Sequence, residues 1–284
     1  MDQQPKANPL AKHFRQPALY APLISQGRYW PEGAINIPAT MELPVYPMTA
    51  RDEITLRTPD ALINGTAIVE IIESCCPVIN DAWAMPSVDV DALLIAIRIA
   101  SYGESMTVSS KCPKCGEEHD YDINLQAALA SIQMPDYDDP TIIDEDLLVY
   151  FKPLNYRQVS QTGQRTYEEE RMILSLSDDS LSDDEKKKVY DEHLKRMIDL
   201  NLDSLVAYTD SILTEDGEAV TDPKFIKEFY ANTKAANLKA LEKRAAKDSK
   251  NVSIQPMDAN CKACEHQFKL EVTFDYASFF ATGS

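Results

Sequence analysis

Four cysteines stand in two pairs, and each pair has the same two-residue gap. The pairs are Cys112-Pro-Lys-Cys115, which is followed by Gly116, and Cys261-Lys-Ala-Cys264. A Cys-x-x-Cys unit at a hairpin tip can turn both thiolates toward one ion, and two such units supply a closed tetrahedral zinc site. The glycine permits the unusual backbone angle that closes such a turn. The sequence therefore predicts one structural Zn²⁺ bound by these four cysteines.

Other chemistries use the same residue types. His119 and His266 lie close to the pairs and could replace a thiolate as a ligand, but we expect both to be ordinary surface residues. An iron–sulfur cluster takes the same ligands, but no redox context supports it here. A thioredoxin-type pair opens a helix after a strand, and neither pair is expected to do so. Four cysteines leave no open metal position, so the ion is expected to stabilise the fold and not to catalyse.

The composition predicts a folded acidic protein without a catalytic signature. The 284 residues are 44% hydrophobic and 26% charged, with a formal net charge of −18. Such a surface repels phosphate backbones, so we expect no nucleic-acid binding and favour a basic protein partner. A solvated acidic surface without any partner is the alternative interpretation. No phosphate-binding glycine loop or known catalytic motif occurs, which predicts that the protein is not an enzyme.

The sequence also indicates where the protein works. No run of about 18 apolar residues occurs, so we expect no membrane-spanning helix and no membrane partner. The start, Met-Asp-Gln-Gln-Pro-Lys, lacks the basic-then-apolar pattern of a secretory signal, so export is not expected. Cysteines in a protein that is not secreted are more often metal ligands or buried thiols than disulfides. The adjacent Cys75 and Cys76 are accordingly expected to be partly buried thiols, neither reactive nor bridging.

Residues 1–47 are predicted to form an extended docking arm. Eight of the seventeen prolines fall there, and proline removes a backbone donor and restricts the preceding residue. The segment nevertheless has too many large apolar side chains to be a solvated linker. An arm that wraps its own domain explains the pattern as well as an arm that docks on another protein. If it docks, the candidate partner-binding residues are Tyr20, Leu23, Ile24, Tyr29 and Trp30.

The remaining patterns predict an α+β fold, a mostly helical domain with small β-hairpins that form a split four-cysteine zinc ribbon. Helices are predicted after Thr58, over about 65–75 and 87–103, near 125–133, over 155–176 and 183–208, and from about 222 and 234. Strands are predicted over 106–110, 121–125, 147–151 and 268–274, with a short hairpin around Asp216-Gly217.

Because 145 residues lie between Cys115 and Cys261, the ribbon must be split around an insertion. We expect three parts. The arm covers 1–47, a helical core with the split zinc ribbon combines 48–126 with 251–284, and a mainly helical insertion covers 127–250. Zinc would join the two ends of the insertion and would stabilise the fold by closing a very long loop.

The predicted helix over 87–103 is apolar on nearly every face, so we expect it at the centre of the core. Arg98 is the one charge in its most apolar part. A buried guanidinium needs a partner, which predicts an ion pair with a nearby carboxylate and a structural role. The candidate partners are Asp89, Asp91, Asp52 and Glu53.

Several short motifs follow one another along the chain in a characteristic order. They are Arg28-Tyr29-Trp30-Pro31, Thr49-Ala-Arg-Asp-Glu53, Pro59 to Gly65, Ile95 to Gly103, Cys112 to Gly116 and Phe274 to Phe280. In this order they resemble the baseplate hub subunit or hub-assembly chaperone family of T-even-like contractile-tailed bacteriophages. The resemblance covers most of 28–125 and, more loosely, 147–280.

The resemblance implies a non-enzymatic virion or assembly protein that binds other baseplate and tail proteins in a hetero-oligomeric assembly. It would be made in the infected bacterial cytoplasm and, if retained, would lie in the tail baseplate of the virion. The long arm favours a structural subunit over a factor that leaves after assembly. Family members differ in whether they carry the cysteines, so the zinc prediction depends on this sequence alone. A zinc-ribbon adaptor or regulator that binds a host protein is the alternative.

Overall fold

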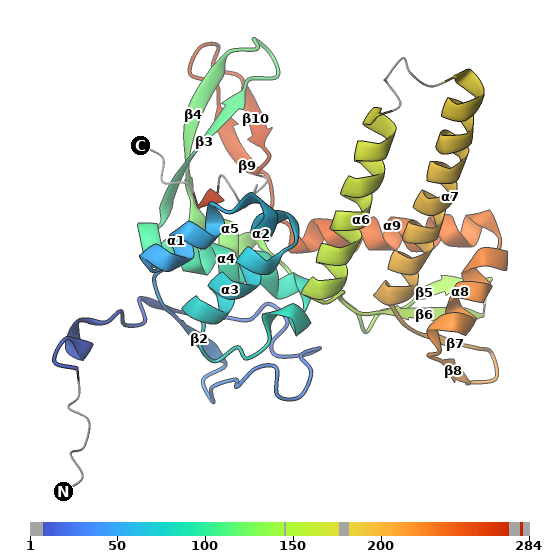
Figure 1. The fold of residues 1–284 in the computed structure, drawn as a ribbon, viewed down its shortest axis with the longest axis horizontal. Helices are drawn as coiled ribbons and strands as arrows, with labels where there is room; N and C mark the ends of the chain where they lie inside the picture. The colour runs from blue at the N-terminus through green and yellow to red at the C-terminus, as the bar shows by residue number, and fades with distance from the viewer. Residues whose placement is uncertain (1–7, 145, 176–181, 273–278, 281–284) are drawn as a thin grey trace, which may run out of the picture.

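The computed structural model describes residues 8–144, 146–175, 182–272 and 279–280 and combines helices with small antiparallel sheets (Figure 1). The α-helices are α1 Ala50–Leu56, α2 Pro59–Ile63, α3 Thr66–Cys75, α4 Ser87–Tyr102, α5 Leu125–Ser131, α6 Tyr156–Ser175, α7 Asp183–Tyr208, α8 Pro223–Asn232 and α9 Ala235–Val252. The strands are β1 Leu19–Pro22, β2 Glu42–Val45, β3 Ser105–Lys111, β4 Glu118–Asn124, β5 Thr141–Ile143, β6 Leu147–Phe151, β7 Thr209–Leu213, β8 Ala219–Val220, β9 Met257–Asn260 and β10 Gln267–Leu270. The predicted mixture of helix and strand is confirmed.

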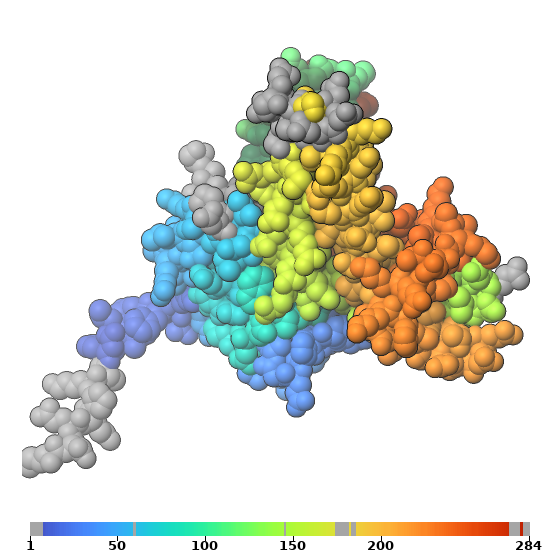
Figure 2. Space-filling view, turned by 45° about the vertical axis from the view of Figure 1, so that its right-hand side comes forward, coloured from blue at the N-terminus to red at the C-terminus, as the bar shows by residue number. Residues whose placement is uncertain are grey.

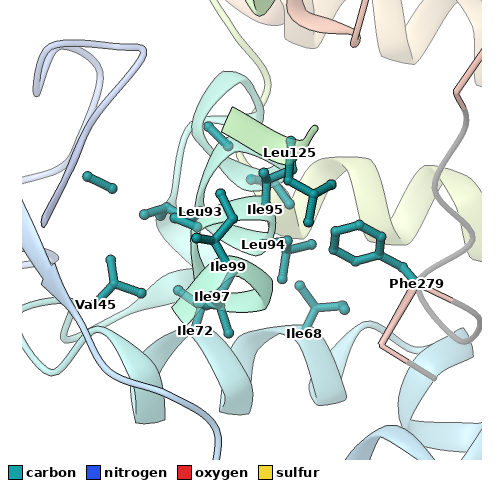
Figure 3. Close-up of a cluster of buried hydrophobic side chains, with 14 of the residues drawn as sticks. Val45, Ile68, Ile72, Leu93, Leu94, Ile95, Ile97, Ile99, Leu125 and Phe279 are labelled. Atoms are coloured by element: carbon teal, nitrogen blue, oxygen red, sulfur yellow. The ribbon is translucent and has the colours of Figure 1, made fainter. Parts of the chain in front are cut away.

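Helix α4 lies at the centre of the first of the two hydrophobic cores that the described residues form, as its sequence predicts. From Val88 to Ile99, nearly every side chain of α4 is buried. Each fully buried Leu or Ile side chain stabilises the folded state by about 1.5–3 kcal/mol. Figure 3 shows how α3, β2, α5 and Phe279 surround this helix, with the labelled side chains Ile68, Ile72, Val45, Leu125, Leu93, Leu94, Ile95, Ile97 and Ile99.

The helices before α4 begin and end at residues with clear local reasons. Thr49 and Asp52 form a capping box at the start of α1, in which each side chain accepts from the other residue's backbone N–H. Gly65 separates α2 from α3 with a φ of 78°. A Cβ atom at Gly65 would lie 2.6 Å from Ser160 Oγ, so glycine also permits the close approach of α6. Gly65 therefore both separates the two helices and forms a packing contact with α6.

Residues 19–47 pack on the chain's own first core. Strands β1 and β2 pair in antiparallel fashion, with Leu19 opposite Val45. Leu23 is only 5% exposed, and both Leu43 and Val45 are fully buried. Over this stretch, the proline-rich segment wraps its own domain, because its apolar side chains supply part of that domain's core.

A buried carboxylate ties this segment to α4. Asp89 is fully buried and accepts hydrogen bonds from the backbone N–H of Ser25 at 2.8 Å, from Ser25 Oγ at 2.5 Å and from Trp30 Nε1 at 2.9 Å. Burial raises the pKa of Asp89, and the hydrogen bonds from Ser25 and Trp30 oppose that rise. The residues beside Asp89 belong to different cores, since Val88 lies in the second core and Val90 in the first.

The second core is built around the four-stranded sheet β5-β6-β7-β8, in which the paired strands are antiparallel. Helices α7, α8 and α9 pack on it, and its buried side chains include Phe151, Ile212, Tyr230 and Leu241. Helices α6 and α7 lie side by side, and they extend away from the sheet, which the C-terminal part of α7 contacts (Figure 1). Because Val88 also joins this core, the predicted insertion packs directly on α4.

The expected carboxylate partner of Arg98 is not found among the described residues. The guanidinium instead donates to the backbone carbonyl of Phe279 and lies over the rings of Tyr102, at 5.5 Å, and Phe279, at 5.3 Å. Burial lowers the pKa of Arg98, and the carbonyl and ring faces compensate part of that cost. Two of the expected partners bond elsewhere, since Asp89 bonds Ser25 and Asp52 bonds Thr49.

Cys75 and Cys76 are free thiols, as predicted, but both are fully buried where the sequence predicts partial burial. Burial, followed by the nearby charge of Asp52, raises the pKa of Cys75 to about 12. Burial raises the pKa of Cys76 as well. A thiol with a raised pKa is seldom a thiolate at neutral pH, so these two residues pack as small apolar side chains.

Candidate metal centre

The two cysteine pairs lie at the tips of two separate hairpins. Strands β3 and β4 pair from Ser105–Asn124 to Lys111–Glu118, and β9 and β10 form a second two-stranded sheet. The hairpins come from opposite ends of the long intervening segment, yet they stand side by side and project in the same direction (Figure 1). The split arrangement predicted for the cysteine pairs is therefore observed.

Both turns have the same backbone. In the first knuckle, defined here as Cys112–Gly116, the N–H of Gly116 donates to the carbonyl of Cys112 at 2.9 Å. In the second knuckle, Cys261–Glu265, the N–H of Glu265 donates to the carbonyl of Cys261 at 3.0 Å. The residue that follows the second cysteine has a positive φ in each, 77° at Gly116 and 58° at Glu265. Each turn thereby directs two sulfurs to the same side.

The four sulfurs form one compact cluster. Cys112 Sγ lies 3.8 Å from Cys264 Sγ, and Cys115 Sγ lies 3.6 Å from Cys261 Sγ. All four sulfurs lie within 4.8 Å of one another. These distances far exceed the roughly 2.0 Å of a disulfide bond. They match the separation of about 3.8 Å that follows from a tetrahedron with zinc–sulfur bonds of about 2.3 Å. The donor set and its spacing fit a closed tetrahedral metal site.

The close spacing of the four thiols also affects their ionisation. Burial would raise the pKa of Cys112, but the backbone N–H groups of Cys115 and Lys114 lower it to about 7. At Cys115 the backbone N–H of Glu117 lowers the pKa, whereas burial and the neighbouring thiols raise it to about 12. Four neighbouring thiols cannot all ionise without compensation, and a cation among them would provide it.

Few contacts other than the sulfurs join the two hairpins near the knuckles. The ring of Tyr121 on β4 meets Phe268 on β10 edge to face, with centroids 5.8 Å apart. Lys262 Nζ donates to the backbone carbonyl of Asp120 at 2.8 Å and lies 6.0 Å from the Tyr121 ring. These contacts are not predicted from the sequence, although strand alternation and the position of Lys262 inside a knuckle could have indicated them.

The two nearby histidines do not belong to the sulfur cluster that the described residues form. His266 stacks on Phe268, with ring centroids 6.4 Å apart and planes 9° apart. His119 lies on β4 opposite Ser110. The cluster therefore contains the four predicted cysteines and neither alternative ligand.

The five candidate partner-binding residues lie in different environments. Tyr20 is 61% exposed and Tyr29 is 36% exposed, although the Tyr29 ring also contacts Tyr137. Leu23 is buried, and Ile24 and Trp30 pack partly against the first core. Only the two tyrosines of this set offer a large exposed surface.

Two other sets of exposed apolar residues are not among the candidates predicted from the sequence. Leu10 and Phe14, before β1, are 63% and 58% exposed. On α7, Tyr190, Leu194 and Ile198 are 50%, 42% and 60% exposed, and their four-residue spacing could have indicated a continuous apolar stripe.

Among the described helices, none has both the length and the apolar character that crossing a membrane requires.

Comparison with known proteins identifies the family. No curated protein and no solved structure matches the chain. A family model described as T4 bacteriophage base plate protein matches residues 36–281, which is most of the sequence. The chain therefore belongs to the T4 bacteriophage base plate protein family.

Proposed function

We propose that this protein is a non-enzymatic structural subunit of the hub region of a bacteriophage tail baseplate, stabilised by one structural zinc ion. Family membership supports the baseplate role. The observation that carries the zinc proposal is the cluster of four sulfurs within 4.8 Å at the tips of two hairpins. The resemblance of the short motifs to hub proteins supports the more specific location.

In this proposal, Cys112, Cys115, Cys261 and Cys264 hold the ion and fill its coordination shell. The metal supplies a cross-link and no chemistry, because four thiolates leave no position for water or substrate. An isolated two-stranded hairpin is marginally stable in water, so two such hairpins gain from a shared ion. The ion also joins the two ends of the predicted insertion, 127–250, to the core formed by 48–126 and 251–284.

The partners that we propose are other baseplate and tail proteins, in a hetero-oligomeric assembly. The exposed apolar residues of the N-terminal segment are the first candidates for such contacts, namely Leu10, Phe14, Tyr20 and Tyr29. Arg15 holds this segment near the first core, because its guanidinium donates to the carbonyls of Pro47 and Ser74 at 2.8 and 2.7 Å. We propose that the protein is made in the infected bacterial cytoplasm and then stays in the tail.

Two measurements test the proposal. Quantitative mass spectrometry of purified virions should find the protein at a fixed ratio to known baseplate subunits. Its absence from virions but presence in infected cells would contradict the structural role and would indicate an assembly chaperone. Elemental analysis of protein purified without strong chelators should find about one zinc per chain. A metal content near zero would reject the zinc proposal and would leave the baseplate role untouched.

A further inference from the structure

An apolar groove of about 700 Å³ lies between α7, α9 and the start of α6. Its apolar walls are formed by Val159, Ile198, Leu202, Leu205, Leu238 and Val252. Val159 is 39% exposed and Ile198 is 60% exposed, so the walls continue onto the surface of α6 and α7. Large apolar side chains beside a groove of this size are typical of a surface that another molecule covers.

The polar groups beneath the groove are bonded to one another. Tyr208 donates its hydroxyl to Asp248 at 2.6 Å, and Arg244 Nε donates to the same carboxylate oxygen at 2.6 Å. Asp248 is 3% exposed. The bond from Tyr208 to Asp248 connects α7 to α9. Because Arg244 already neutralises Asp248, this network offers little to a polar ligand. The groove is therefore suited to apolar side chains.

The apolar surface extends along α7 beyond the groove. Leu194 and Tyr190 precede Ile198 by four and eight residues, which places them on the same side of the helix. From Tyr190 to Leu202 the stripe runs about 18 Å, at 1.5 Å per residue. On α6, Gly163 follows Val159 by four residues, and a Cβ atom there would meet nothing within 4 Å. Figure 2 shows the two helices side by side on one face of the molecule.

The charged residues that line the groove favour a partner of opposite charge. Two carboxylates and no lysine or arginine are among its lining residues. Arg244 neutralises Asp248, whereas Glu242 is exposed and has no ion pair within the described part of the chain. A second copy of this chain would bring another acidic surface, given the net charge of −18. A basic partner complements the groove better.

We propose that this groove binds an amphipathic helix of another tail protein, with apolar residues in the groove and a lysine or arginine that pairs with Glu242. Walls made of helices favour this mode, in which residues at i, i+3 or i+4, and i+7 enter an apolar groove. The proposal rests on the structural role proposed above, because it names the surface through which such a subunit would hold a neighbour.

Two synthetic 18-residue peptides test it on the full-length protein. Both have the same leucine face and form amphipathic helices, but one has lysines and the other glutamates on its polar face. Fluorescence anisotropy should show binding of the lysine peptide and none of the glutamate peptide. Hydrogen exchange should slow in 190–205 and 238–252 when the lysine peptide binds.

Matched variants locate the binding. Ile198→Asp should weaken binding at least about tenfold, and Glu242→Gln should weaken it several-fold and reduce its salt dependence. Ile142→Asp is the control, because Ile142 is 62% exposed on β5 and does not line the groove. Thermal melting should be the same for both aspartate variants, since both positions are exposed.

Three results would overturn the proposal. Equal binding by the wild type and Ile198→Asp would show attraction by net charge alone. Equal loss in Ile198→Asp and Ile142→Asp would place the peptide elsewhere. A concentration-dependent dimer that Ile198→Asp abolishes would make a second copy the occupant. Virion content and zinc content are measured separately, so failure of the proposed function remains distinguishable from failure of the groove.

Discussion

The two knuckles share one backbone conformation but differ at the residue that adopts the left-handed angle. Gly116 occupies this position in the first knuckle at no steric cost, whereas Glu265 occupies it in the second. A residue with a Cβ atom at such an angle costs about 1–2 kcal/mol. The first knuckle is thus favoured by its own sequence, and the second has to be held by its surroundings.

The hairpin that carries the second knuckle is also shorter than the hairpin that carries the first. Strands β3 and β4 have seven residues each, whereas β9 and β10 have four each. The second hairpin therefore has fewer ladder hydrogen bonds and a strained tip. From this difference we infer that the second hairpin depends on the cross-link more than the first does.

Loss of a metal ligand should have the largest effect. Cys112→Ser and Cys261→Ser should each release the ion and destabilise the fold by about 4 kcal/mol or more, because either change opens the same cross-link. The melting temperatures of the two variants should fall alike. Hydrogen exchange in either variant should be faster in 257–270 than in 105–124, since the second hairpin is the weaker one.

The histidine variants His119→Ala and His266→Ala are the controls for this experiment. Both should retain about one zinc per chain and nearly wild-type melting, because neither residue belongs to the sulfur cluster. Faster exchange in the first hairpin than in the second would contradict the comparison, even if both serine variants lost the metal.

The aromatic contact between the hairpins should come second in magnitude. Phe268→Ala removes the edge-to-face contact with Tyr121 and should destabilise the protein by about 2 kcal/mol, less than a fully buried phenylalanine would. Tyr121→Phe keeps the ring and should change stability by less than about 0.5 kcal/mol, since the buried hydroxyl has no hydrogen-bond partner among the described residues. Urea denaturation measures both, and a large loss in Tyr121→Phe would reveal a bond from this hydroxyl.

Substitutions at Gly116 and Glu265, the two knuckle residues with a positive φ, should change stability less and in opposite directions. Gly116→Ala should destabilise the protein by about 1 kcal/mol, because alanine resists the positive φ. Glu265→Gly should stabilise it by up to about 1 kcal/mol by removing the same strain. Chemical denaturation of the zinc-bound proteins provides the measurement. If Glu265→Gly destabilises the protein instead, the glutamate side chain contributes more than its backbone strain costs.

Removing the lysine inside the second knuckle should have the smallest effect. Lys262→Met keeps the aliphatic stem but loses the bond to the Asp120 carbonyl and the contact with the Tyr121 ring. The expected loss is about 0.5–1 kcal/mol. A melting curve indistinguishable from the wild type would mean that the sulfurs and Phe268 alone hold the hairpins together.

The sequence predicts features that local chemistry decides. The cysteine cluster follows from ligand type and spacing, and the central position of α4 follows from an apolar run without a polar face. Arg98 is a counterexample, because a buried guanidinium indicates that a hydrogen-bond acceptor is needed but does not indicate which residue provides it. The backbone carbonyl of Phe279 has no signature in sequence.

Surfaces are less predictable, because burial depends on which elements meet. Leu23 and Tyr20 lie three residues apart in the same proline-rich segment, yet one is buried and the other is exposed. The groove between α7 and α9 depends on how two distant helices cross, which neither helix encodes alone.

Three consecutive residues of α4 connect the two cores and the N-terminal segment. Val88 belongs to the second core, Asp89 holds Ser25 and Trp30, and Val90 belongs to the first core. This one helical turn thus contacts the first core, the second core and the segment that contains Ser25 and Trp30. A displacement of any one of these parts would strain its contacts with α4. We therefore expect the two described cores to move together as one rigid body.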